Sequence, residues 1–333
     1  MKIVVDAFGG DNAPEEIVKG AVGALLADGG IDLVLTGKED VIKKILSELN
    51  FSPDRIEIVN APSVITNDDV PTAAIRSKTD SSLVAGLDYL KKNNADAFVS
   101  AGSTGAVLTG AALKIGRIEN VTRPALAPLL PCVDGSKILL IDCGANVDCR
   151  PEMLLQFGVM GDAYMRAIGV KNPRVALLNN GAEEKKGCEL TKAAHALLKE
   201  SVLNFVGNME ARDIMSGGAD VLVADGFHGN IALKASEGTA LSILKLLKDA
   251  ITGGGIAAKL GGALIKKSLK SMKSKIDYTE SGGALFVGVS KVVVKAHGSA
   301  KAGTIRAAVL QANEAAKAGL VEKIGEAMKD GGR

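Results

Sequence analysis

The sequence has 333 residues, of which 47% are hydrophobic and 23% are charged, and its formal net charge is +2. This length can bury a large core, in one big α/β domain or in two smaller ones. Aromatic residues make up only 3% of the chain and tryptophan is absent. This composition excludes the aromatic platforms and the basic field of nucleic-acid-binding proteins, so we expect no nucleic-acid partner.

β-Branched apolar runs alternate with helical patterns along the chain, which is typical of a parallel sheet flanked by helices. The predicted strands are Lys2–Asp6, Asp32–Thr36, Arg55–Val59, Ala95–Ser100, Lys137–Asp142, Arg174–Leu178, Asn204–Val206, Val221–Ala224 and Val292–Val294. The predicted helices are Pro14–Ala27, Asp40–Leu49, Ser81–Asn93, Gly105–Leu113, Met153–Ile168, Cys188–Lys199, Gly229–Leu247 and Thr304–Ala316. No linker or internal repeat is visible, so we expect one α/β domain over residues 1–333.

A smaller element is predicted at residues 237–277. Ser236–Asp249 has a helical pattern, the glycines of Thr252–Gly255 break it, and a second helical pattern continues to about Lys275. Two helices joined by a glycine-rich tip make a helical hairpin. Such a hairpin can serve as a dimer arm.

Cysteine spacing and hydropathy indicate which cellular environment to expect for the protein. The four cysteines form no Cys-x-x-Cys pair and the three histidines are far apart, so we predict no metal site. The chain opens directly on a strand without a signal peptide, and no apolar stretch reaches the roughly 18 residues that span a bilayer. We expect a cytoplasmic protein with reduced thiols that at most lies on a membrane surface.

Several predicted strands end in Asp or Ser, followed by glycine and a helix start. These strand ends are Asp6, Ser100, Asp142 and Asp225. Because ligands bind outside the carboxyl ends of strands in open α/β sheets, we expect the four loops to converge at one edge on one cleft. Glycine N–H groups and helix N-termini suit an anion there. In the first loop Asp6 is the better candidate, since Asp11 can simply cap the helix.

The segment Arg76–Ser82 concentrates two cations and several hydroxyls before a predicted helix. Arg76 and Lys78 match an anion such as phosphate, although Ser81 can also be a helix cap. His228 and His297 lie in glycine loops and are candidates for the site. Nucleotide-binding glycine motifs, the Gly-x-Ser-x-Gly elbow and the His-Glu-x-x-His motif are all absent, so no cofactor and no serine triad are predicted.

Together these motifs resemble one family over nearly the whole chain, the bacterial acyl-ACP:phosphate acyltransferases of phospholipid synthesis. The segments that carry the resemblance, in order, are Asp6–Asp11, Arg76–Ser82, Ser100–Ala106, Arg123–Ala127, Asp142–Asn146, Gly207–Asp213, Asp225–Asn230, Gly282–Gly288 and His297–Ser299. Phe8, Ser103, His228, Leu285 and Ala300 stand where this family usually has Met, Asn, Thr, Pro and Ser.

The resemblance implies a three-layer α/β/α fold with a mostly parallel sheet, like phosphotransacetylase and the isopropylmalate dehydrogenases, and a homodimer. The implied reaction transfers a fatty acyl group from the acyl carrier protein (ACP) to inorganic phosphate. The acyl phosphate would then feed a membrane glycerol-3-phosphate acyltransferase. Because CoA and ACP share the phosphopantetheine arm, a phosphate acetyl- or butyryltransferase that uses acyl-CoA is the close alternative.

This reaction needs positioning of an anion and donors for the thioester oxyanion more than it needs a strong base. We expect Arg76, Lys78, Ser81 and Ser82 to hold phosphate, while Asn146, His228 or Asn230 faces the carbonyl. The other expected substrate-binding residues are Asp6, Gly9, Gly10, Gly102, Ser103, Thr104, Asp225 and His297.

The second helix of the hairpin has a basic and an apolar face. Leu264, Ile265, Leu269, Met272 and Ile276 project to one side, and Lys266, Lys267, Lys270 and Lys273 to the other. A basic amphipathic helix can bind an anionic membrane surface or the acidic ACP, and Leu260 near the tip can enter a bilayer. The alternative is an ordinary dimer helix whose lysine face is solvated.

Two functions of other classes are weaker. A decarboxylating dehydrogenase of similar fold would need a compact carboxylate cluster for a divalent metal, and no such motif is present. A non-catalytic scaffold would not need several polar strand-end loops.

Overall fold

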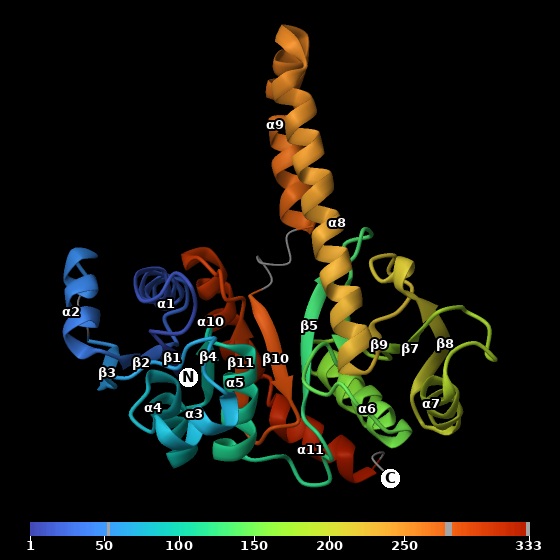
Figure 1. Cartoon of the computed structure of the whole chain (residues 1–333), viewed down its shortest axis with the longest axis horizontal. Coiled ribbons are helices and arrows are strands. Elements are labelled where there is room, and N and C mark those ends of the chain that lie inside the picture. The colour runs from blue at the N-terminus through green and yellow to red at the C-terminus, as the bar shows by residue number, and fades with distance from the viewer. Residues whose placement is uncertain (52–53, 277–281, 331–333) are drawn as a thin grey trace.

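The computed structural model describes residues 1–51, 54–276 and 282–330. Helices cover both faces of one large sheet, and two long helices project from this body as a hairpin (Figure 1). The three-layer α/β/α fold predicted from the sequence is therefore confirmed.

The described residues form one sheet of eleven strands. Its strands, in spatial order, are β3 (Ile56–Asn60), β2 (Asp32–Gly37), β1 (Lys2–Asp6), β4 (Ala97–Ser100), β11 (Val292–Ala296), β10 (Gly283–Val287), β5 (Ala125–Pro131), β6 (Lys137–Ile141), β9 (Val221–Val223), β7 (Arg174–Asn179) and β8 (Asn204–Glu210). The strands from β3 to β11 are parallel, as are those from β6 to β8. Between these halves, β10 and β5 pair antiparallel with each other and with their outer neighbours.

This central pair reverses the direction of the sheet. Three successive antiparallel steps separate β11 from β6, so the two parallel halves run in opposite directions. The carboxyl ends of β1 and β4 therefore lie at the opposite edge of the sheet from those of β6 and β9. The expectation that all four polar strand-end loops share one edge is wrong for this reason.

The helices fall on the two faces according to the alternation of buried side chains along the strands. The helices are α1 (Glu15–Ala27), α2 (Glu39–Glu48), α3 (Pro71–Ser77), α4 (Ser82–Tyr89), α5 (Thr104–Gly110), α6 (Pro151–Ala167), α7 (Glu189–Glu200), α8 (Gly226–Gly253), α9 (Gly255–Ile276), α10 (Ala302–Lys317) and α11 (Leu320–Asp330). Short helical turns lie at η1 (Leu90–Asn94), η2 (Ala111–Ile115) and η3 (Ala211–Asp213). In β1, Ile3 and Val5 pack into the layer that contains α1, α6 and α10, and Val4 packs against α3, α4 and α5. Both faces of this strand are buried, as a parallel sheet requires.

Every predicted strand is present, but the prediction missed β5 and β10, along with helices α3 and α11. β5 contains Pro128 and Pro131, and proline within a run argues against a central strand because it cannot donate to the ladder. β10 lies between Gly282 and Gly288, which both have positive φ angles and look like loop residues in the sequence. The two missed strands are those that join the halves of the sheet.

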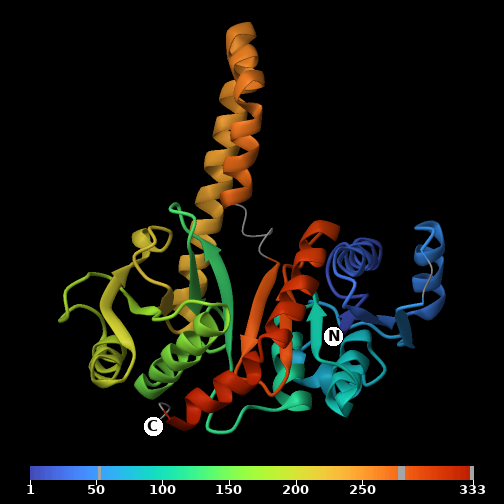
Figure 2. The same ribbon diagram turned by 180° about the vertical axis from the view of Figure 1, so that it is seen from behind.

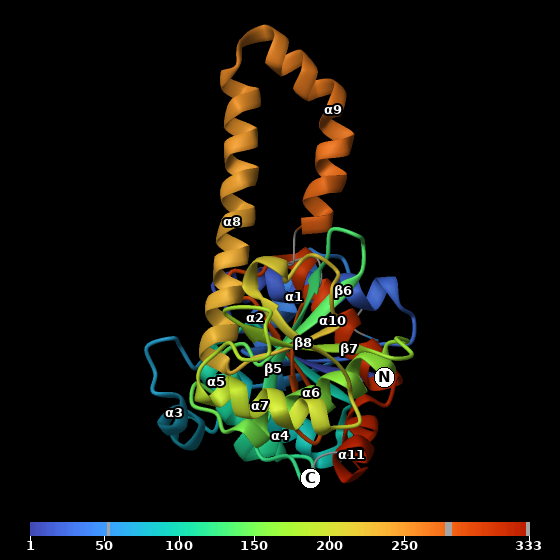
Figure 3. The same cartoon turned by 90° about the vertical axis from the view of Figure 1, so that its right-hand side faces the viewer.

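The hairpin is longer than the predicted 237–277 segment and begins inside the body. Asp225 caps α8 by accepting hydrogen bonds from the backbone N–H groups of Phe227 and His228. The first turns of α8 are buried, and the rest of the helix runs outward, away from the sheet (Figures 2 and 3). α9 returns after a bend at Gly255, whose φ of +71° is in the glycine-favoured region. Residue 277 lies outside the described residues.

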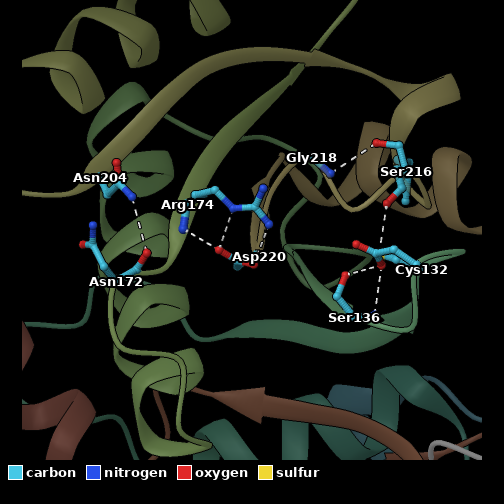
Figure 4. A network of polar contacts seen from close by, with 10 residues as sticks. Cys132, Ser136, Asn172, Arg174, Asn204, Ser216, Gly218 and Asp220 are labelled. Carbon is cyan, nitrogen blue, oxygen red and sulfur yellow. Dashed lines mark hydrogen bonds and ion pairs between the residues drawn. The ribbon is translucent and has the colours of Figure 1, made fainter.

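An ion pair connects β7 with the start of β9 at the far side of the sheet (Figure 4). The guanidinium of Arg174 donates to both carboxylate oxygens of Asp220, at 3.1 and 3.0 Å, and its backbone N–H donates at 2.7 Å. Burial raises the pKa of Asp220, but the hydrogen bonds from Arg174 outweigh this effect and leave the pKa below its usual value.

Candidate active site

A cavity of about 390 Å³ lies over β10 and β5, between α5 and α8, and is called the central cavity below. Thr104 follows β4, Gly144 follows β6, Asn230 follows β9 and His297 follows β11, and all four line it. The strand-end loops of both halves therefore meet, although they come from opposite directions. They meet over the middle of the β10–β5 pair, where Ala284, Pro128 and Leu129 also line the cavity.

A second cavity of about 260 Å³, here the loop cavity, lies beside the central cavity. Polar loop residues line much of it, including Gly10, Asp11, Gly102 and Ser103. Thr104 and Lys295 line both cavities, so the two spaces adjoin at these side chains.

A third cavity of about 420 Å³, the outer cavity, lies at the carboxyl ends of β7 and β9. Asp225 and His228 line it, together with apolar residues such as Leu178 and Ile231. His228 Nδ1 lies 2.6 Å from Asp225 Oδ2. His228 and Asn230 are thus close in sequence but line different cavities.

Asp6 is buried beneath its loop and lines neither the central nor the loop cavity. It accepts a hydrogen bond of 2.7 Å from Ser100 Oγ, which in turn accepts one of 3.0 Å from the N–H of Gly102. Burial raises the pKa of Asp6, and hydrogen bonds from Ser82 and Ser100 oppose that rise. A side chain at Gly9 would approach Asp6 Oδ2 to 2.5 Å, so glycine allows the loop to close over this carboxylate.

Asp142 has the same organising position at the end of β6. It accepts hydrogen bonds from the N–H groups of Leu126, at 2.8 Å, and Asn146, at 2.7 Å. The side-chain amide of Asn146 donates to Asp142 and to Pro124 O, both at 2.9 Å. This amide is therefore occupied within the loop, and Asn146 does not line the central cavity.

No residue of the Arg76–Ser82 segment lines either of the two adjoining cavities, but Lys78 Nζ donates to the carbonyl oxygen of Val64, which lines the loop cavity, at 3.1 Å. Arg76 is exposed on α3, and the ammonium of Lys78 pairs with Asp69 at 2.7 Å. Ser81 is buried and caps α4 by accepting a hydrogen bond from Val84 N, while Ser82 is buried beside Asp6. Of the other expected substrate-binding residues, Gly10, Gly102, Ser103, Thr104 and His297 do line the central or the loop cavity.

Sequence reasoning missed three charged residues of the central cavity, Lys234, Glu237 and Lys295. Lys234 and Glu237 form an ion pair of 2.7 Å on α8. Lys295 is buried, and this burial lowers the pKa of its ammonium to about 8. Burial also lowers the pKa of His297, with Lys234 contributing to the shift. The predicted strand ended at Val294, whereas β11 continues to Ala296. A prediction longer by one residue would have placed Lys295, a cation, in a buried strand.

The hairpin residues expected to contact a membrane or ACP are exposed where their side chains are described. Leu264 is 87% exposed, and Leu260, Lys266 and Lys267 are also on the surface. The side chain of Lys270 lies outside the described residues. No helix in the described ranges is long and apolar enough to cross a bilayer.

Comparison with known proteins identifies the family. A family model described as "Fatty acid synthesis protein" matches residues 1–323. A phosphate acyltransferase of Clostridium acetobutylicum is 46% identical over 99% of both chains, and one of Thermoanaerobacter pseudethanolicus is 49% identical over 94% of this chain and 92% of its own. The chain belongs to the phosphate acyltransferase family. The resemblance inferred from the motifs is confirmed.

Solved structures of similar fold are more distant in sequence. A phosphotransacetylase from Streptococcus pyogenes superposes with a TM-score of 0.59 at 18% identity, covering 99% of this chain and 94% of its own. A 4-hydroxythreonine-4-phosphate dehydrogenase from Klebsiella pneumoniae gives a TM-score of 0.55 at 15% identity, with 95% and 99% coverage. These likenesses confirm the expected phosphotransacetylase and dehydrogenase type of fold. Within the described residues, no group of three or more His, Cys, Asp or Glu side chains is arranged to hold a metal ion.

Proposed function

We propose that the protein transfers a fatty acyl group from acyl-ACP to inorganic phosphate in the central cavity. The observation that carries this proposal is the pairing of a buried cation with an apolar wall in one cavity. Lys295, which forms no ion pair among the described residues, suits an anion, whereas Lys234 is paired with Glu237. Leu129, Leu130 and Leu233 suit an alkyl chain. Membership of the phosphate acyltransferase family supports the same reaction.

The proposed reaction makes modest demands on the protein. A phosphate oxygen attacks the thioester carbonyl carbon, the C–S bond breaks, and sulfur leaves with the bonding electron pair as the thiolate of ACP. A thiol with a pKa of about 8.5 is a good leaving group, so a strong general acid is not needed. The protein supplies positioning and oxyanion stabilisation, which we assign to Thr104, Asn230 and Lys295 at the cavity surface.

Phosphate-dependent release of free thiol tests this function. The protein is incubated with palmitoyl-ACP, with and without ³²P-labelled inorganic phosphate, and both the free thiol and the lipid-extractable acyl phosphate label are measured. We expect thiol and labelled acyl phosphate to appear in equal amounts and only when phosphate is present. The same assay with short-chain and long-chain acyl-CoA decides between the ACP-dependent enzyme and a phosphate acetyl- or butyryltransferase. No release from either class of donor would contradict the assignment.

We further propose that the protein works as a homodimer at an anionic membrane surface, where it passes acyl phosphate to a membrane glycerol-3-phosphate acyltransferase. The support is the hairpin, which exposes large apolar side chains on both helices. These side chains include Leu241, Ile243, Leu246, Leu260 and Leu264. Exposed apolar residues in this number are typical of an interaction surface. The neighbouring Lys266 and Lys267 suit anionic lipid headgroups or the acidic surface of ACP.

A further inference from the structure

Lys295 is in an unusual environment for a lysine. It lies on β11, near the middle of the sheet. Val292, Val294 and Ala296 of the same strand pack into the core layer on the other face of the sheet. Only 7% of Lys295 is exposed, and lysine is rarely buried unless it is paired. Its Nζ donates to the carbonyl oxygens of Ala101, at 3.4 Å, and Ala296. In the described part of the chain no carboxylate forms an ion pair with it.

The lysine stands where two cavities of different chemistry adjoin. The loop cavity offers backbone and hydroxyl groups of the loops after β1 and β4, at Gly10, Gly102 and Ser103. The central cavity has an apolar wall from β5 and α8. Lys295 and Thr104 are the residues that line both. Acyl transfer to an anion needs such a junction. The anion requires a polar site and the acyl chain an apolar one, yet the phosphate oxygen must reach the thioester carbonyl carbon.

We propose that Lys295 is a catalytic residue whose ammonium binds the attacking phosphate at this junction, with the phosphate in the loop cavity and the acyl thioester in the central cavity. This inference rests on the proposed function and deepens it. A phosphate oxygen held by Nζ then faces the carbonyl carbon across the junction. The ammonium remains a donor throughout and transfers no proton.

The charges around Lys295 set how the binding responds to pH. Asp11 and Asp6 attract the ammonium, while Lys234, which is paired with Glu237 on α8, repels it. His297 lies in the same cavity. Burial is the largest influence and lowers the pKa of Lys295 to about 8. The charge is therefore present below pH 8 and is lost above it, so the affinity for phosphate decreases as the pH rises through this range.

Direct binding of inorganic phosphate, measured by calorimetry on the full chain, tests the inference without any acyl donor. We expect wild type to bind phosphate and Lys295→Met to lose this binding. Lys295→Arg keeps the charge at all accessible pH values, so any binding it retains is expected to stay constant above pH 8. Lys291→Met is the matched control, because it makes the same substitution at the residue just before β11, where Lys291 donates to Ala95 O and lines neither cavity. Since Lys295→Met removes a buried charge, its thermal midpoint is expected not to fall.

Steady-state kinetics give the second readout. For Lys295→Met we expect kcat/KM for phosphate to decrease roughly 100-fold, as when one charge-stabilising donor is removed. The KM for palmitoyl-ACP is expected to stay within about threefold of wild type, because the substitution does not change the apolar wall that binds the acyl chain equally in the ground state and in the transition state. Phosphate binding by Lys295→Met that equals wild type, or no phosphate binding by wild type, would overturn the inference. Lys295-dependent phosphate binding without thiol release would instead refute the proposed function and leave the phosphate site standing.

Discussion

At the scale of single residues, the polar groups at the strand ends divide into those that build the loops and those that face the cavities. Asp6 and Asp142 direct their carboxylates at backbone N–H groups, and Asn146 donates to Asp142. Asn230 and His297 face the central cavity instead. In the sequence the two kinds look alike, because each is a polar residue beside glycine after an apolar strand. Only the three-dimensional structure separates them, because it shows which side chains form hydrogen bonds within a loop and which line a cavity.

Asp142→Asn tests the loop-building role. One carboxylate oxygen becomes an NH₂ group that faces the N–H donors of Leu126 or Asn146, so at least one buried hydrogen bond is lost. We expect the free energy of unfolding to fall by about 2 kcal/mol, measured by urea denaturation. Asp148→Asn, at an exposed position in the same loop, is the control. Equal stability of the two variants would mean that the carboxylate does not organise the loop.

The separation of His228 from Asn230 gives a second test at this scale. Asn230→Ala removes a polar side chain from the central cavity, and we expect kcat/KM for palmitoyl-ACP to decrease by roughly 10- to 100-fold. His228→Thr changes only the outer cavity, and we expect kcat/KM to remain within about threefold of wild type. The reverse order of the two effects would move the site to the outer cavity.

At the scale of elements, the prediction was best where one local pattern dictates the structure. β1 is predicted to the residue because Lys2–Asp6 is an apolar strand with a glycine loop after it. β5 was missed because Pro128 breaks the strand pattern, yet it pairs with Ala284 of β10 in an antiparallel ladder. Such a pairing cannot be read from a local pattern, because the two strands lie far apart in the sequence and each supplies the backbone hydrogen-bond partners of the other. Without β5 and β10 the reversal of the sheet could not be predicted, and neither could the meeting of loops from both halves.

The ion pair between Arg174 and Asp220, which connects β7 with the start of β9, predicts that the fold loses stability at low pH. Folding lowers the pKa of Asp220, and a carboxyl group of this kind stabilises the fold above its unfolded pKa and loses that effect as the pH falls. Arg174 is 40% exposed, so solvent screens part of the attraction. We therefore expect Asp220→Asn to lower the free energy of unfolding by about 1 to 2 kcal/mol at pH 7.

Urea denaturation at several pH values checks this prediction. The difference between wild type and Asp220→Asn is expected to shrink as the pH falls below about 4, because Asp220 of the unfolded chain then binds a proton that folded Asp220, with its lower pKa, binds only at still lower pH. Glu184→Gln breaks the exposed pair with Lys199 and is expected to show no measurable change. A difference that stays constant down to low pH would show that the charge of Asp220 is not what stabilises the connection.

At the scale of the whole molecule, the hairpin and the cavities belong to one continuous element. α8 begins at the Asp225 cap, carries Asn230, Leu233 and Lys234 past the central cavity, and then leaves the body as the first arm of the hairpin (Figure 3). The sequence predicted the hairpin and its glycine tip, because the break is local. It did not reveal that the same helix lines the cavity, since this depends on how α8 packs against β6 and faces β5 across the cavity. A surface that touches lipid or ACP at the tip would thus be joined to the cavity by a single continuous helix.

This continuity makes the hairpin the place to test the proposed membrane contact. Leu264 is 87% exposed, and burying one such side chain in lipid contributes about 1.5 to 3 kcal/mol. We therefore expect Leu264→Glu to weaken binding to phosphatidylglycerol-containing vesicles by at least roughly tenfold in a flotation assay. Val202→Glu, at a position 91% exposed on the body, makes the same substitution away from the hairpin and is expected to float like wild type. Sedimentation of the variants in solution reports the oligomeric state separately. Loss of the dimer with unchanged flotation would assign Leu264 to the subunit interface, whereas loss of flotation by an intact dimer would assign it to the membrane.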